Sequence, residues 1–112
     1  MAAYMIAMIK VDDPETYKEY SSRTPPIVKK HGGRFLARGG EVDTIEGEPF
    51  NARLAILEFP SKKVVHDFFA DPEYQAAAKY RKKSSQARIL VIDGVADTYA
   101  PEAKVVKSKT TR

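Results

Sequence analysis

The segment from His31 to Gly40, His-Gly-Gly-Arg-Phe-Leu-Ala-Arg-Gly-Gly, most constrains the fold of this chain, because a helical pattern stops there and a strand begins at once. Gly32 and Gly33 suit the left-handed backbone with which helices commonly end, and the cations just before them suit the negative end of a helix. The alternation that follows, from Arg34 to Arg38, predicts a strand. The segment therefore predicts the middle of a β-α-β unit.

Similar signals on both sides predict two such units. Strands are expected over residues 4–11, 34–38, 53–59 and 87–92, and helices are expected to begin after the N-caps Asp13, Ser61 and Asp71. Asp13-Pro14-Glu15 and Asp71-Pro72-Glu73 form a weak internal echo, since each opens a helical piece with the same cap. Two right-handed β-α-β units joined by a hairpin predict an α+β, ferredoxin-like sandwich, a four-stranded antiparallel sheet with its helices on one face.

Two dipeptides predict interruptions in these elements. Pro25-Pro26 is expected to kink or break the first helix into two shorter pieces, because each proline lacks an amide hydrogen and crowds the preceding turn. Gly39-Gly40 is expected to mark a bulge or a sharp bend, with extended chain continuing from Glu41 to Glu46.

The strands at residues 4–11 and 53–59 are apolar on both faces. One layer of helices covers one face of a sheet, so the second apolar face needs another partner. A homodimer that packs sheet against sheet is the predicted solution.

Composition limits the remaining possibilities. A chain of 112 residues forms one domain, and the absence of cysteine excludes disulfides and zinc-thiolate sites. The absence of cysteine also fits a reducing compartment, so a cytoplasmic protein is expected. No apolar run approaches the roughly 20 residues of a membrane helix, so the protein is expected to be soluble. Most of the net charge of +4 lies in residues 101–112. This distribution predicts a domain at residues 1–95 followed by a solvated basic tail at residues 96–112. It does not favour a nucleic-acid-binding protein, because the domain itself carries little net charge. A tail that binds polyanions is the alternative.

Several short blocks of the sequence stand in a characteristic order. They are Asp13-Pro14-Glu15 with Tyr17 and Tyr20, Gly32 to Gly40, Leu57 to Ser61, and Asp71 to Tyr74 with Arg81. Together these blocks resemble the family DUF1330, a domain of unknown function in the dimeric α+β barrel superfamily. The resemblance covers about residues 4–95 and implies a ferredoxin-like protomer whose two sheets form a barrel in the dimer. It also implies a pocket between sheet and helices, and relatives that include monooxygenases, dehydratases and isomerases working without cofactors or with haem.

Glu58 is the first candidate for chemistry in that pocket. It shares strand parity with Leu54 and Ile56, and an apolar setting would raise its pKa towards the range of a general acid or base unless an arginine pairs with it. The alternative is a structural ion pair, with an arginine at position 38, 53 or 81 as partner.

Two arginines of one strand are candidates for binding an anion. Arg34 and Arg38 share parity, so both are expected on one side of the sheet, where guanidinium groups can clamp a carboxylate. Arg81, after the small Ala77 and Ala78 on its helix, is expected to reach the same cleft.

The two histidines and the tyrosines have ordinary structural interpretations beside functional ones. His31 is expected to end a helix, and His66 is either a surface residue or a proton shuttle. Tyr17 and Tyr74 are expected to pack in the core or to point a hydroxyl at a ligand. No acidic residue stands at ligand spacing from either histidine, so no metal site is predicted.

These residues favour a small homodimeric protein that binds a modest organic molecule, with a carboxylate-bearing ligand as one candidate, in the helix-sheet cleft. Two alternatives stay open: a cofactor-independent monooxygenase or isomerase with Glu58 or His66 as proton handler, and a non-catalytic structural or stress-related protein. No cofactor is expected, and the sequence leaves open whether the protein is an enzyme. The candidate ligand-binding residues are Arg34, Arg38, Arg53, Tyr17, Tyr74 and Arg81.

Overall fold

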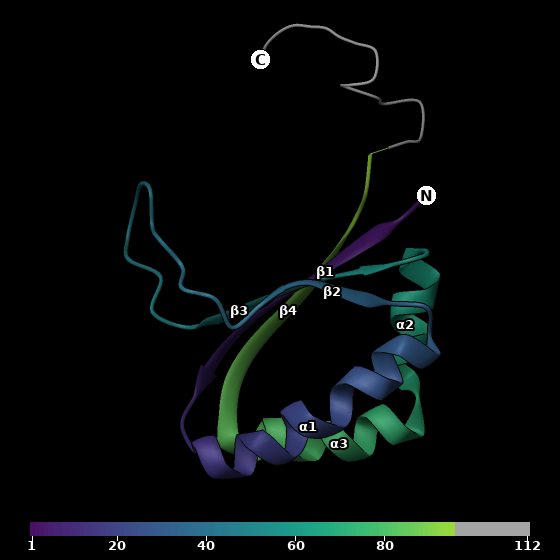
Figure 1. The fold of residues 1–112 in the computed structure, drawn as a ribbon, viewed down its shortest axis with the longest axis horizontal. Coiled ribbons are helices and arrows are strands. Elements are labelled where there is room, and N and C mark those ends of the chain that lie inside the picture. The colour runs from purple at the N-terminus through teal and green to yellow at the C-terminus, as the bar shows by residue number, and fades with distance from the viewer. Residues whose placement is uncertain (96–112) are drawn as a thin grey trace, which may run out of the picture.

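The computed structural model describes residues 1–95, and these residues form one sheet with its helices on a single face (Figure 1). The predicted basic tail at residues 96–112 lies outside the described residues. The elements, in chain order, are β1 (Ala3–Val11), α1 (Pro14–Lys30), β2 (Arg34–Arg38), β3 (Arg53–Phe59), α2 (Lys62–Ala70), α3 (Pro72–Ser84) and β4 (Ser85–Asp93). Among these, no helix is long and apolar enough to cross a membrane.

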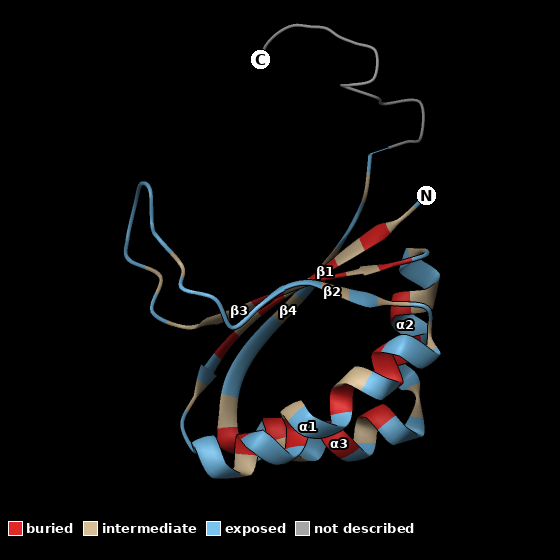
Figure 2. Cartoon of the chain, in the orientation of Figure 1, coloured by how far each residue is buried: buried red, intermediate tan, exposed pale blue. Residues whose placement is uncertain are grey.

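The four strands lie in the order β2-β3-β1-β4, and every neighbouring pair is antiparallel. This order and the helices on one face confirm the predicted ferredoxin-like α+β fold. Alternate residues of β1, namely Ala3, Met5, Ala7 and Ile9, are buried beneath the helices. Figure 2 shows the buried residues on the strands and along the three helices, so the core lies between the two layers.

Local capping explains where the helices begin. The side chains of Asp13, Ser61 and Asp71 accept hydrogen bonds from the backbone amides of Thr16, Val64 and Glu73 respectively, as the N-cap prediction requires. A proline occupies the first turn of both α1 and α3, where its missing amide hydrogen costs nothing.

Helix α1 runs without a break through Pro25 and Pro26, so the prediction of two shorter pieces is wrong. The two prolines leave the carbonyls of Ser21 and Ser22 without their usual amide donors. Ser22 and Pro26 are exposed and Ser21 and Pro25 are half-buried, so water can take the place of the missing donors. The other face of the same stretch is fixed by buried side chains.

The glycine pair after α1 meets two separate demands. Gly32 has φ +76°, the left-handed conformation predicted for the end of the helix. Gly33 lies against the ring of Phe59 on β3, where a Cβ atom would come within 2.5 Å of the ring. The first glycine therefore serves the backbone turn and the second serves close packing of the chain on the sheet.

The connection between β2 and β3 differs from the prediction. Residues 41–46 belong to a loop that projects away from the helices, and no strand is assigned to them (Figure 1). The bulge in the β2-β3 ladder falls between Phe35 and Ala37 instead of at the glycine pair. Gly39, with φ +75°, turns the chain out of the sheet.

The sheet face away from the helices carries a band of apolar side chains. Ile6 pairs in register with Ile56 on β3 and with Leu90 on β4, so three apolar residues lie side by side across the sheet. Leu90 is 47% exposed and Ile92 is 58% exposed, and no helix among residues 1–95 covers them. The prediction of a sheet that is apolar on both faces is confirmed. The band consists of Ile6, Met8, Leu54, Ile56, Leu90 and Ile92.

Asp71 ties the end of α1 to the start of α3. Its Oδ2 atom lies 2.7 Å from Lys30 Nζ and 2.7 Å from His31 Nε2, and its Oδ1 atom accepts the amide of Glu73. These hydrogen bonds, of which the one from Lys30 has the largest effect, hold the pKa of the Asp71 carboxyl well below its usual range. The position of His31 at the helix end confirms its predicted structural role.

Replacing Asp71 with asparagine is expected to lower the melting temperature at pH 7, because asparagine keeps the cap but loses the charge. The pKa of Asp71 is depressed in the folded state, so its contribution is present above the unfolded-state pKa of about 4 and decreases as the pH falls below it. The difference between wild type and Asp71→Asn should therefore shrink between pH 5 and pH 2, measured by thermal unfolding. Asp67→Asn, which removes an exposed pair with Lys63, is the control and should change little.

Candidate functional site

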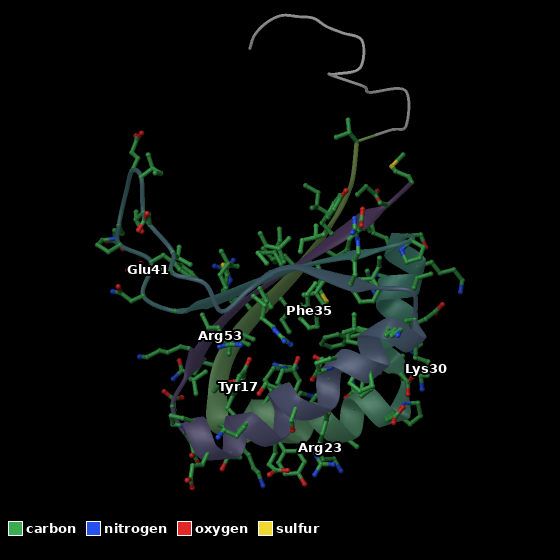
Figure 3. The ribbon with its side chains drawn as sticks, in the orientation of Figure 1. Tyr17, Arg23, Lys30, Phe35, Glu41 and Arg53 are labelled. Carbon is green, nitrogen blue, oxygen red and sulfur yellow. The ribbon has the colours of Figure 1, made fainter. Side chains whose placement is uncertain are left out.

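A cleft lies between α1 and the strands β2, β3 and β1 on the helix-covered face of the sheet. Ala7 and Ala55, paired in register, form part of its floor, and Tyr17 and Tyr20 form its helical wall. Phe35 closes one side. Figure 3 shows Tyr17 and Arg53 next to each other in the gap between α1 and the strands. The open volume inside is about 30 Å³, which is room for a group of the size of a carboxylate or one to two waters.

Arg38 and Arg53 provide the charge of this cleft. The Arg38 guanidinium lies 4.3 Å from the ring centroid of Phe35, and that of Arg53 lies 5.7 Å from the ring centroid of Tyr17. Neither forms a salt bridge with any carboxylate of residues 1–95. Two guanidinium groups held by aromatic rings and lacking an acidic partner are available to an anion.

The bulge in β2 separates Arg34 from Arg38. Arg34 pairs with Glu58 and Arg38 pairs with Ala55, which lie on opposite faces of β3. The prediction that Arg34 and Arg38 project to one side is therefore wrong, because one extra residue in a strand reverses the alternation beyond it. The arginine that joins Arg38 in the cleft is Arg53, from the other end of the loop.

Arg81 lies behind the cleft wall. It is 6% exposed, and its guanidinium lies 5.6 Å from the ring centroid of Tyr20. Its Nε is buried without a hydrogen-bond partner among residues 1–95, and no carboxylate of these residues pairs with it. Arg81 does not touch the open volume itself, but it adds positive charge behind Tyr20.

The tyrosines divide between cleft and core. Tyr17 lines the cleft, and burial raises the pKa of its hydroxyl, although the charge of Arg53 opposes the shift. Tyr20 also lines the cleft, and its hydroxyl lies 2.9 Å from that of Tyr74. Burial, with the Tyr74 hydroxyl, raises the pKa of Tyr20 far above its usual value, so the Tyr20 hydroxyl stays protonated. Tyr74 is fully buried and does not reach the open volume.

Glu58 lies on the other face of the sheet. Its Oε1 atom accepts a hydrogen bond of 2.7 Å from Arg34 Nε, and its Oε2 atom accepts one of 3.2 Å from the hydroxyl of Tyr4. The hydrogen bond from Arg34 is the main reason that the pKa of Glu58 is lowered, and the hydrogen bond from Tyr4 also lowers it. The predicted ion pair of Glu58 is confirmed, so the raised pKa that was expected without an arginine partner does not occur. The partner is Arg34, and the predicted partners Arg38, Arg53 and Arg81 are wrong.

His66 lies on α2 at the rim of a second cavity. The side chain is exposed, and the cavity of about 150 Å³ beside it runs between α2 and β4. Its walls include Phe69, Ile89 and Val91. No group of three or more metal-ligating acids and histidines occurs in the part of the chain that the structure describes.

Sequence reasoning missed several parts of the cleft wall, among them Phe35 and Thr24. Phe35 was expected only as a strand residue, and Thr24 carried no expectation at all, yet both line the cleft. The signal for Thr24 was its spacing, since Tyr17, Tyr20 and Thr24 recur at helical intervals on one side of α1. Thr24 is buried and donates its hydroxyl to the Tyr20 carbonyl at 2.7 Å.

Solved structures with the same fold come from several bacteria. A protein of unknown function from Rhodopseudomonas palustris is 19% identical, with a TM-score of 0.69 over 85% of this chain and 83% of that one. A dimeric ferredoxin-like protein of unknown function from Jannaschia sp. CCS1 is 12% identical, with a TM-score of 0.69 over 84% of this chain and 100% of that one. These likenesses show the fold alone.

A third similar structure has a described activity. SnoaB, a cofactor-independent oxygenase from Streptomyces nogalater, is 15% identical, with a TM-score of 0.63 over 90% of this chain and 98% of that one. No functionally curated protein matches the sequence significantly.

A family model confirms the resemblance that the sequence blocks carried. The model covers residues 2–95, which includes every helix and strand described above and both cavities. The chain therefore belongs to the DUF1330 family, a domain of unknown function.

Proposed function

We propose that this protein is a homodimeric binding protein for a small organic acid, whose carboxylate lies in the cleft between α1 and the sheet. The observation that carries the proposal is the pair of guanidinium groups of Arg38 and Arg53, which face the cleft without an acidic partner among residues 1–95. Arg53 is half-buried and Arg38 is exposed. Leaving the half-buried charge of Arg53 unpaired is costly, so an anion that pairs with it is stabilised there, and Arg38 supplies a second guanidinium group to the same cleft.

The other walls of the cleft supply an apolar and aromatic setting. Ala7, Ala55 and Leu57 form a floor without polar side chains, and Tyr17 and Phe35 hold the two arginines through their ring faces. Ligand sites commonly combine such apolar walls with a few placed charges. The apolar floor supports a carboxylate with an organic body over an inorganic anion.

Binding without catalysis has more support than acid-base chemistry. Within the described residues the cleft wall holds no carboxylate and no histidine, and the hydroxyls of Tyr17 and Tyr20 have raised pKa values. Glu58 and His66, the proton handlers expected from the sequence, lie outside this cleft. A proton acceptor near neutral pH would have to come from the ligand itself.

The second part of the proposal is the dimer. The apolar band on the outer face of the sheet would be covered by the same band of a second copy, as in a closed two-fold assembly. The similar protein from Jannaschia is described as dimeric, which supports a dimer of this chain.

Calorimetric titration with benzoate and butyrate, and with their neutral amides, tests the ligand class. The acids are expected to bind and the amides are not, because only the carboxylate can pair with both guanidinium groups. Arg53→Met keeps the apolar stem and removes the charge, and should weaken acid binding by roughly tenfold to a hundredfold, as for the loss of a charged hydrogen bond.

Arg23→Met is the matched control. Arg23 lies on the exposed side of α1, where it pairs with Glu19, so its loss should leave acid binding unchanged (Figure 3). Equal binding of acids and amides, or equal effects of Arg53→Met and Arg23→Met, would contradict the proposal.

A further inference from the structure

Two cavities on the helix-covered face of the sheet share one wall. The cleft under α1 lies over β2, β3 and β1, and the second cavity lies over β1 and β4 beneath α2. Met5 on β1, which is 4% exposed, lines both of them. It stands between Leu57 on β3 and Val91 on β4 in the sheet register, at the boundary between the two cavities.

The second cavity suits an apolar group. Its apolar side-chain walls are Met5, Val65, Phe69, Ile89 and Val91, with His66 as the polar residue at the rim. The open volume is about 150 Å³, a size at which an apolar protein cavity accepts a molecule such as benzene. Apart from His66 at the rim, these walls carry no polar side chain, so a carboxylate deep in the cavity would lose its hydration without compensation.

The sheet surface between Arg53 and Met5, which forms the floor of the cleft, carries only small side chains. Arg53 pairs with Ile9 in the sheet register, and the next inward-facing pair along the strands is Ala7 with Ala55. Two alanines side by side leave a shallow trough in the sheet surface. The trough runs from the Arg53 row towards Met5, whose Cα lies about 13 Å from that of Ile9 at the usual rise per strand residue.

Met5 is suited to move out of the way. Its side chain is unbranched, has three rotatable bonds and adapts to irregular space at low cost. A branched or aromatic residue at this position would separate the cavities more firmly, because it has fewer ways to turn aside. A change of Met5 rotamer is therefore the smallest rearrangement that joins the cleft to the second cavity.

We infer that the organic acid carries an extended aliphatic chain, which follows the Ala7-Ala55 trough, displaces the Met5 side chain and ends in the cavity under α2. The inference rests on the proposed function, because Arg38 and Arg53 hold the carboxylate. Met5 then sets the length of chain that the protein accepts.

Calorimetric titration with straight-chain carboxylates from butyrate to dodecanoate, below their micelle concentrations, tests this inference. Affinity is expected to rise by about fourfold per methylene buried, up to the length that fills the second cavity, and to stop rising beyond it. Met5→Phe should block the passage, so that affinity stops rising at a shorter chain length than in wild type. Met5→Ala should increase decanoate affinity more than butyrate affinity.

Met8→Phe is the matched control. Met8 lies on the same strand but on the outer face, where it pairs with Leu54 and Arg88, so the chain-length profile should stay that of the wild type. Circular dichroism confirms that each variant is folded. A flat profile from butyrate to dodecanoate in wild-type protein, or a Met5→Phe profile equal to that of wild type, would overturn the inference while short acids still bind. Absence of binding for every acid would overturn the proposed function as well.

Discussion

Replacing Phe68 with alanine is expected to lower the free energy of unfolding by about 3–5 kcal/mol, the usual cost of removing a buried phenylalanine ring. Phe68 on α2 is fully buried, with ring centroids of Tyr74 at 4.4 Å, Phe59 at 5.1 Å and His31 at 5.8 Å. The ring therefore joins α2 to α3, to β3 and to the end of α1. Domains of this size have total stabilities of about 5–15 kcal/mol, so the loss is a large part of the whole.

Chemical denaturation of Phe68→Ala and Phe69→Ala, followed by circular dichroism, measures this effect. Phe69 is the matched control, because the same residue type lies next in the chain but is only half-buried and lines the open second cavity. Its replacement should cost clearly less, since part of its surface is already in water. Equal losses for the two variants would show that Phe68 is not the centre of the helix-sheet packing.

The elements of the fold could be predicted because their signals are local. The caps Asp13, Ser61 and Asp71 act within one helical turn, and each begins the helix that the sequence predicted. Gly32 takes the left-handed conformation that ends α1 for the same kind of local reason. The uninterrupted passage of α1 through Pro25 and Pro26 was not predictable in this way, because it depends on which side of the helix faces water.

The cleft was only partly predictable, because the local sequence of a strand does not determine which of its side chains face the helices. Glu58 does share parity with Leu54 and Ile56, as expected, but the face they share is the one without helices. In a strand that is apolar on both sides, the pattern does not indicate which side the helices cover. The parity of Glu58 therefore could not place it relative to the cleft.

The bulge between Phe35 and Ala37 explains why the predicted anion-binding pair, Arg34 and Arg38, is wrong. Parity counted along the sequence joined Arg34 to Arg38, whereas the bulged strand brings Arg38 to Arg53. No glycine or proline marks this bulge in the sequence. Arg38 and Arg53 flank the loop that joins β2 to β3, and this closeness to both ends of a hairpin is the signal that could have paired them.

Replacing Leu90 with glutamate is expected to convert the proposed dimer into monomers. Leu90 lies on the outer face beside Ile6, and it is 47% exposed in the single protomer. The substitution leaves the carboxylate in water in the monomer, but the two-fold symmetry of a dimer would bury two such charges. Burying an unpaired charge costs several kcal/mol, so the dissociation constant should rise by at least a hundredfold.

Light scattering coupled to size-exclusion chromatography measures the mass of each variant, and circular dichroism confirms that its secondary structure is intact. Ile45→Glu is the matched control: Ile45 is 94% exposed on the projecting loop, so the same charge is added there without touching the sheet face. Wild type and Ile45→Glu should have the mass of two chains, and Leu90→Glu that of one. If Leu90→Glu keeps the mass of two chains, the copies associate through another surface, and the apolar band on the outer sheet face is not the interface.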